Sequence, residues 1–123
     1  MTFITKKLGD DGEEIAVQYL LDNGYEILER KYVSHKKEVD IIAKSPDEVL
    51  VFVEVKTRSN LNYGEPEYAL TIGKQKAIIR VAQEFLYERD IVDTAVRFDV
   101  IGIQFKEDGS PEINHLEHAF MKW

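Results

Sequence analysis

Residues 50–56, which read Leu-Val-Phe-Val-Glu-Val-Lys, constrain the fold of this chain more than any other stretch. The run is rich in β-branched and aromatic residues and follows a Pro46–Asp47 turn, which predicts a β-strand. Both alternating faces are apolar over most of the run, so we expect a central strand covered on both sides. Its end carries Glu54 and Lys56 on one face. Charges there need partners, and either a salt bridge or a metal ion with a phosphate would supply them.

The composition is that of an ordinary folded domain. With 123 residues, of which 44% are hydrophobic and 32% charged, residues 1–123 are expected to form one domain. The absence of cysteine excludes disulfides and thiolate metal sites. No stretch resembles a signal peptide or a membrane span, so we expect a cytoplasmic location and no membrane partner. The net charge of −7 argues against coating nucleic acid through bulk electrostatics but is compatible with a local site.

Residue periodicity predicts two helices and four further strands. Helices are expected over residues 11–23 and from Thr71 or Lys74 to Arg89; the strands are expected at 25–33, 38–44, 95–105 and 113–120, with a loop at 58–67. Asp11 and Glu14 resemble a helix-capping pair, and Asn23–Gly24 is a stop signal. The order α-β-β-β-α-β-β predicts an α/β fold with a mixed central sheet of about five strands flanked by helices. The second helix is expected to be a crossover that brings the next strand parallel to residues 50–56.

A charged residue heads the apolar stripe of each predicted helix. Glu13 precedes apolar residues at helical spacing, so it is expected to face inward. Lys74 stands at the same place on the second helix. The two stripes comprise Glu13, Ala16, Val17 and Leu20, and Lys74, Ile78, Val81 and Phe85.

A hairpin between residues 38–44 and 50–56 would bring two carboxylates together. If its turn centres on Asp47, Asp40 stands opposite Glu54, with Lys56 beside Glu38. Two negative charges this close raise the pKa of at least one of the carboxyl groups unless a cation lies between them. Asp and Glu oxygens suit Mg²⁺ or Mn²⁺, so one of these is the expected cofactor. The alternation on the first of these strands places Glu38, Asp40 and Ile42 on one face, opposite Val39, Ile41 and Ala43.

Each of these residues also has a purely structural interpretation. Glu54 and Lys56 alone would form a salt bridge at a strand end, and Asp40 would pair with a lysine across strands. Glu13 would be a first-turn carboxylate favoured by the helix dipole. Lys74 and Gln75 would be ordinary first-turn polar residues.

Four charged or titratable residues in the last two predicted strands are expected to have structural and not catalytic roles. Arg97 and Asp99 are most simply an ion pair along or across strands. His115 and His118 are expected on opposite faces of the last strand, without the spacing of metal ligands. We therefore place none of these four residues in the site.

Several motifs resemble a nuclease superfamily and, within it, one family of uncertain function. Asp40 followed by Glu54-Val55-Lys56 resembles the PD-(D/E)xK nuclease superfamily, whose core hairpin presents an Asp and then an E-x-K triplet. Residues 9–16 resemble G-x-x-G-E-x-x-A, residues 37–42 resemble G-E-I-D-L-I, residues 51–58 resemble F-V-E-V-K-x-R, and Gly64, Ala69, Lys74–Gln75 and residues 97–100 follow in order. Together these motifs resemble the YraN-like family of bacterial proteins, related to archaeal Holliday junction resolvases.

The resemblance implies a restriction-endonuclease-like core and a metal-dependent endonuclease that acts on branched or structured DNA. Asp40 and Glu54 would bind Mg²⁺ or Mn²⁺, with the Val55 carbonyl as a third ligand. Lys56 would be the catalytic lysine, and Glu13 would add a carboxylate from the first helix. The residues expected to contact nucleic acid are Lys36, Lys37, Arg58, Lys74 and Gln75. Resolvases act as two-fold dimers, so a homodimer is a further expectation.

The sequence also departs from the family pattern. Lys37 stands where the family often has Gly, and Lys31 and Val33 stand where Asn and Arg are usual. The missing Arg removes one phosphate contact, for which the additional lysines would compensate. With the acidic net charge, this favours an alternative function, a catalytically inactive nucleic-acid-binding or assembly module with a nuclease-like fold. A protein-interaction domain, the other alternative, predicts no salt-dependent DNA binding.

Overall fold

The computed structural model describes residues 3–59 and 70–121 and confirms the predicted order of elements. Residues 60–69, which include Gly64, Ala69 and most of the predicted loop, lie outside the described residues. The elements are α1 (Phe3–Asp22), β1 (Glu26–Ser34), β2 (Lys37–Lys44), β3 (Leu50–Arg58), α2 (Ile72–Glu88), β4 (Val96–Phe105) and β5 (Pro111–Phe120). In the part of the chain that the structure describes, neither helix is long and apolar enough to cross a membrane.

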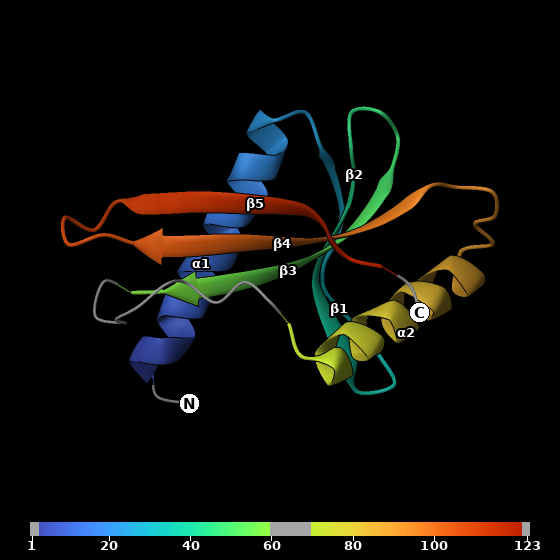
Figure 1. Cartoon of the computed structure of the whole chain (residues 1–123), viewed down its shortest axis with the longest axis horizontal. Coiled ribbons are helices and arrows are strands. Elements are labelled where there is room, and N and C mark those ends of the chain that lie inside the picture. The colour runs from blue at the N-terminus through green and yellow to red at the C-terminus, as the bar shows by residue number, and fades with distance from the viewer. Residues whose placement is uncertain (1–2, 60–69, 122–123) are drawn as a thin grey trace.

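The five strands form one mixed sheet in the order β1-β2-β3-β4-β5 (Figure 1). β3 and β4 are parallel, and the other neighbouring strands are antiparallel. α2 connects β3 to β4, which confirms the predicted crossover. β3 is the central strand, and its residues 50–54 are all buried, as the two apolar faces predicted.

A helix covers each face of the sheet. On one face α1 buries its predicted stripe, in which Ala16 and Leu20 have no exposed surface, against β2, β3 and β4. On the other face α2 buries Ile78, Val81 and Phe85 against a second apolar cluster that includes Phe52 of β3. The charged residue that heads each stripe is therefore brought to the sheet from one side or the other.

The predicted start of the first helix was wrong, whereas its predicted end is confirmed. The helix begins at Phe3 instead of residue 11, because residues 3–10 contain no proline and helical hydrogen bonding continues through them, so Asp11 is not a capping residue. At the other end Gly24 has a φ of 83°, which a glycine adopts without strain. The Tyr25 amide donates to the Leu20 carbonyl at 3.0 Å, which closes a Schellman motif.

A close contact with β3 fixes the position of α1. Gly12 packs on Thr57, and a Cβ atom at Gly12 would overlap the Thr57 side chain. Only glycine therefore fits at this point of the helix. Because Glu13 is the next residue, the same contact determines how near its carboxylate lies to the end of β3.

A buried polar network joins α1 to β4 and β5. Arg97 makes two hydrogen bonds to Asp99, at 2.9 and 3.0 Å, so the predicted ion pair is confirmed. His115 Nε2 also lies 2.7 Å from Asp99, and its Nδ1 lies 3.0 Å from the Tyr19 hydroxyl. Burial raises the pKa of Asp99, but the bonds from His115 and Arg97 outweigh it and hold that pKa below its usual value.

We expect Gly12→Ala to destabilise the protein by roughly 1–3 kcal/mol, because the added methyl group overlaps Thr57 in a packed contact. Urea denaturation measures the change. Gly9→Ala is the matched control, since nothing lies within 4 Å of a Cβ there, and it is expected to be neutral or stabilising. Adding Thr57→Ala to Gly12→Ala is expected to restore most of the loss. Equal stability of the two alanine variants would contradict the contact.

Candidate functional site

The predicted register between β2 and β3 is confirmed. Ile41 pairs with Val53 and Lys44 with Leu50, so the hairpin turn centres on Asp47. The next position along this ladder places Asp40 beside Glu54, and their side chains come within hydrogen-bonding distance. The two carboxyl groups are therefore adjacent, at the point where the pairing between β2 and β3 ends.

At Asp40 the regular alternation of β2 side chains between the two faces of the sheet is interrupted, and we call this interruption the roll-over. Ile41 packs in the cluster under α1, whereas Val39 packs in the cluster under α2. Residues two apart in a regular strand share a face, so the prediction that Val39 shares a face with Ile41 and Ala43 was wrong. On β1, Lys31 lies level with Asp40 and has a φ of 51°, a left-handed conformation that lets the ladder change faces.

At the roll-over β2 separates from β3, and the Asp40 carboxylate faces the edge of β3 that is no longer paired with β2. The pairs between the two strands run no further than Ile41 and Val53, and Oδ2 of Asp40 accepts a hydrogen bond from the Val55 amide at 2.8 Å. In a strand, the N–H and C=O of one residue point to the same edge. The Val55 carbonyl therefore faces the same gap as the Asp40 carboxylate. Glu38 and Lys56, expected to be adjacent, lie beyond the paired residues.

The two carboxyl groups are electrostatically unfavourable as bare anions. Glu54 is 8% exposed. Burial, followed by the charge of Glu54, raises the pKa of Asp40 from 3.8 to about 7. The Val55 amide and the Lys74 charge oppose this rise. Without a further cation, Asp40 therefore retains its proton up to about neutral pH.

Glu13 lies buried within electrostatic range of Asp40. Its Oε1 atom has no hydrogen-bond partner among the described residues, although the guanidinium of Arg30 lies 3.6 Å away, at ion-pair distance. Burial, followed by the charge of Asp40, raises the pKa of Glu13. The prediction that α1 brings a carboxylate towards the site is thus matched by the geometry, although its role stays a prediction.

Lys74 reaches the carboxylates directly. Its Nζ atom lies 3.1 Å from Oε2 of Glu54. This ion pair was not predicted from the sequence, although the place of Lys74 at the head of the buried stripe was the signal for it. The neighbouring Gln75 is used differently, because its amide donates to the Leu70 carbonyl at 2.9 Å.

The other predicted cations lie at the start of β2 and at the end of β3. Lys56 and Arg58 are half-buried at the end of β3. Lys36 and Lys37 are exposed at the turn between β1 and β2. These four side chains are available for contacts with an anion.

The donor set fits a hard divalent cation. No group of three or more Asp, Glu or His side chains suited to one metal ion occurs in the described ranges. Magnesium needs only one or two carboxylates, with water and phosphate completing its shell. Asp40 and Glu54 supply that pair beside the carbonyl edge of Val55, and the buried Oε1 atom of Glu13, which accepts no hydrogen bond from the described residues, adds an oxygen on the α1 side.

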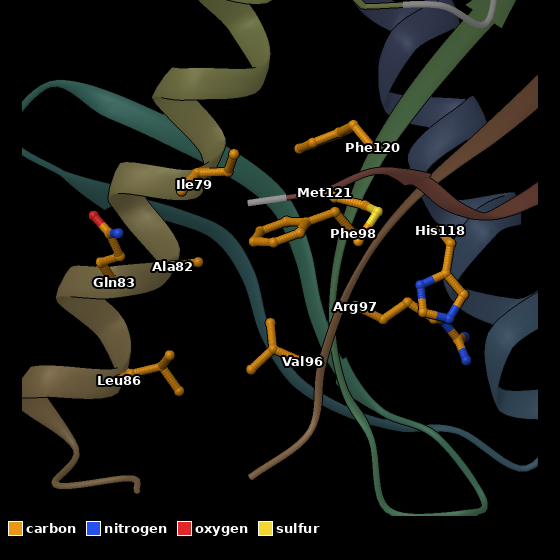
Figure 2. A pocket seen from close by; sticks show the side chains of 10 residues that line it. All are labelled: Ile79, Ala82, Gln83, Leu86, Val96, Arg97, Phe98, His118, Phe120 and Met121. Atoms are coloured by element: carbon orange, nitrogen blue, oxygen red, sulfur yellow. The ribbon is translucent and has the colours of Figure 1, made fainter. Parts of the chain in front are cut away.

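A cavity of about 400 Å³ lies elsewhere, between α2 and the strands β4 and β5 (Figure 2). Its lining is largely apolar and includes Phe98, Phe120 and Met121, with His118 at one side. None of the predicted site residues lines it. The candidate site is therefore the open end of the β2–β3 hairpin.

The fold and the site define a class: a mixed α/β protein with an Asp on one central strand and a Glu-x-Lys triplet on the next, at the point where the strands separate. Residues 12–103 match the model of the uncharacterised protein family UPF0102, and the chain belongs to this family. This confirms the YraN-like family predicted from the motifs.

Relatives match along most of their length. A UPF0102 protein of Clostridioides difficile (strain 630) is 44% identical over 115 residues, covering 94% of this chain and 97% of its own. One from Rhodococcus opacus (strain B4) is 45% identical over 113 residues, covering 92% and 95%. Among solved structures, Pyrococcus furiosus SfsA in complex with Ca²⁺ matches with a TM-score of 0.43 and 17% identity, over 92% of this chain and 63% of that one. The relatives' names state no activity.

The raised pKa of Asp40 predicts a pH dependence of stability in metal-free buffer. Because the native state holds this proton up to about pH 7 and the unfolded state releases it near 3.8, the contribution is full below the lower value and lost as the pH rises through the higher one. Urea denaturation from about pH 4 to about pH 8 should therefore show the wild type losing up to a few kcal/mol relative to Asp40→Asn, which cannot titrate. Parallel pH profiles would show that the pKa of Asp40 is not raised in the folded protein.

Proposed function

We propose that this protein is a metal-dependent endonuclease that hydrolyses phosphodiester bonds in branched or structured DNA. The observation that carries the proposal is the meeting of Asp40 and Glu54 at the open end of the hairpin, beside the free edge of Val55. The resemblance to the PD-(D/E)xK superfamily supports the reaction class, and membership of UPF0102 is compatible with it.

In this proposal Asp40, Glu54 and the Val55 carbonyl bind Mg²⁺ or Mn²⁺. The ion would activate water and stabilise charge on the phosphate. Lys56 lies on the same strand face as Glu54, two residues further on, where its ammonium would orient the attacking water or neutralise the developing charge. Glu13 would add negative charge at the rim of the site from α1.

The cations around the site would contact the DNA backbone. Lys36 and Lys37 extend from the β1–β2 turn and Arg58 from the end of β3, while Lys74 lies at the start of α2. With a net charge of −7, binding would depend on this local cluster more than on the whole surface. We expect Gln75 to contribute less to DNA binding than these four cations, because its side-chain amide already donates a hydrogen bond to the Leu70 carbonyl. A cytoplasmic location and a two-fold dimer remain predictions.

One observation favours an alternative, a catalytically inactive nucleic-acid-binding or assembly module. The Lys74 ammonium already contacts Glu54, so the protein's own side chain compensates part of the site's negative charge. If this ion pair is permanent, the site binds no metal. The module would then bind DNA in a salt-dependent manner without cutting it.

We expect purified wild type to cut four-way, flapped or single-stranded DNA when Mg²⁺ or Mn²⁺ is present, and to be inactive with EDTA. Asp40→Ala and Glu54→Ala should abolish cutting because each removes a metal ligand. Lys56→Ala should slow it by about 10²–10³-fold, the usual cost of removing one group that stabilises charge developing in the transition state. Gel assays of end-labelled substrates measure the rates.

The matched control is Lys106→Ala, which removes an exposed lysine from the turn between β4 and β5 and should retain full activity. A wild type that cuts none of these substrates with either metal ends the enzyme proposal. Salt-dependent DNA binding without cutting then supports the inactive module, and neither binding nor cutting supports a protein-interaction domain.

A further inference from the structure

The Lys74–Glu54 ion pair has an unusual setting. The Lys74 side chain is 43% exposed, whereas that of Glu54 is 11% exposed, so a half-solvated ammonium is held on a nearly buried carboxylate. Thr71 caps α2 and its hydroxyl accepts a hydrogen bond from the Lys74 amide at 3.1 Å. Together with the Gln75 bond to Leu70, this cap fixes the first turn, from which the ammonium reaches the sheet end.

The ammonium contacts a carboxylate that the proposed metal needs. A divalent ion bound between Asp40 and Glu54 would use the same Glu54 group that Lys74 contacts at 3.1 Å. Two cations at contact distance from one carboxylate repel each other, although solvent around the exposed ammonium weakens this repulsion. Lys74 contacts only Oε2 of Glu54, so a metal ion at the other oxygen is sterically possible, but the repulsion makes the two cations compete for this carboxylate.

We propose that Lys74 is an intramolecular competitor of the metal ion, whose ammonium holds Glu54 in the metal-free protein and leaves when the metal binds. This inference rests on the proposed function. A partly exposed ion pair contributes little free energy, so the exchange costs little on the lysine side. For Glu54, which is nearly buried, one cation replaces another and the carboxylate is never left unpaired.

The exchange also links metal binding to nucleic-acid binding. Once released, the ammonium lies at the start of α2, where it meets the phosphate backbone of DNA bound at the site. A phosphate that attracts Lys74 away from Glu54 would in turn make room for the metal. By thermodynamic reciprocity each ligand then increases the affinity for the other by the same factor.

Calorimetric titration with Mn²⁺ in the absence of DNA tests the competition. Lys74→Met should bind Mn²⁺ roughly five-fold more tightly than the wild type, the factor that corresponds to losing one partly exposed ion pair. Lys74→Arg retains the cation and should match the wild type. Lys76→Met removes an exposed cation two residues further along the same helix and should also match it, which separates contact competition from general charge effects.

Each contrary outcome has a distinct meaning. Unchanged or weaker Mn²⁺ binding by Lys74→Met overturns the competition but leaves the metal site of the proposed function in place. An equal gain in Lys76→Met overturns it as well, because the effect would then be one of net charge. If none of the proteins binds Mn²⁺, the competition and the metal-dependent function fail together.

The linkage has its own measurement. In a Lys56→Ala background, used to suppress cutting, fluorescence anisotropy gives the affinity for a four-way DNA with and without Mn²⁺. The factor by which Mn²⁺ tightens DNA binding should be smaller when Lys74→Met is added. The coupling through Lys74 is then absent, and only the interaction of the metal ion with the DNA phosphate remains. An unchanged factor would show that released Lys74 does not bind the DNA.

Discussion

The hydrogen bond from the Val55 amide to the Asp40 carboxylate is the interaction on which the site depends. It forms because β2 separates from β3 just after the Ile41–Val53 pair, which leaves an edge of the central strand without a partner strand. A side chain at the separation point satisfies the first free amide, as a buried edge requires. The consequence is a carboxylate held against Glu54, an arrangement that the fold stabilises in spite of its charge.

The two helices meet this charge from opposite faces of the sheet. α1 brings the buried, negative Glu13, and the packing of Gly12 on Thr57 keeps it close. α2 brings the positive Lys74. The site thus has more carboxylates than cations in contact with them, and the cation that contacts Glu54 is the ammonium of a flexible lysine side chain. We therefore expect a divalent metal ion to bind these carboxylates more strongly than the ammonium does.

The parts of this structure that follow from residue periodicity could be predicted from the sequence. The centre of the hairpin turn determines the register, so the sequence alone predicts that Asp40 and Glu54 stand side by side. The heads of the helical stripes likewise indicated which charged residues approach the sheet, because side chains three and four apart share a helix face. Family motifs added the chemistry expected of those residues.

What escaped prediction depends on backbone conformations and contacts between distant elements. The roll-over at Asp40 requires Lys31 in a left-handed conformation, which residue type does not signal, since lysine rarely adopts it. The network around Asp99 joins Tyr19 and His115 across 96 residues of sequence, beyond the reach of a local pattern. The early start of α1 escaped because Asp11 has the residue type of a cap, although the helix continues through it.

A crystal structure of the wild type soaked in Mn²⁺ tests the central claim most directly. Our account predicts anomalous density between the carboxylates of Asp40 and Glu54, at about 2.0–2.3 Å from their oxygens and beside the Val55 carbonyl. Soaked crystals that show no metal there, with the carboxylates still joined to each other and to Lys74 alone, would contradict it.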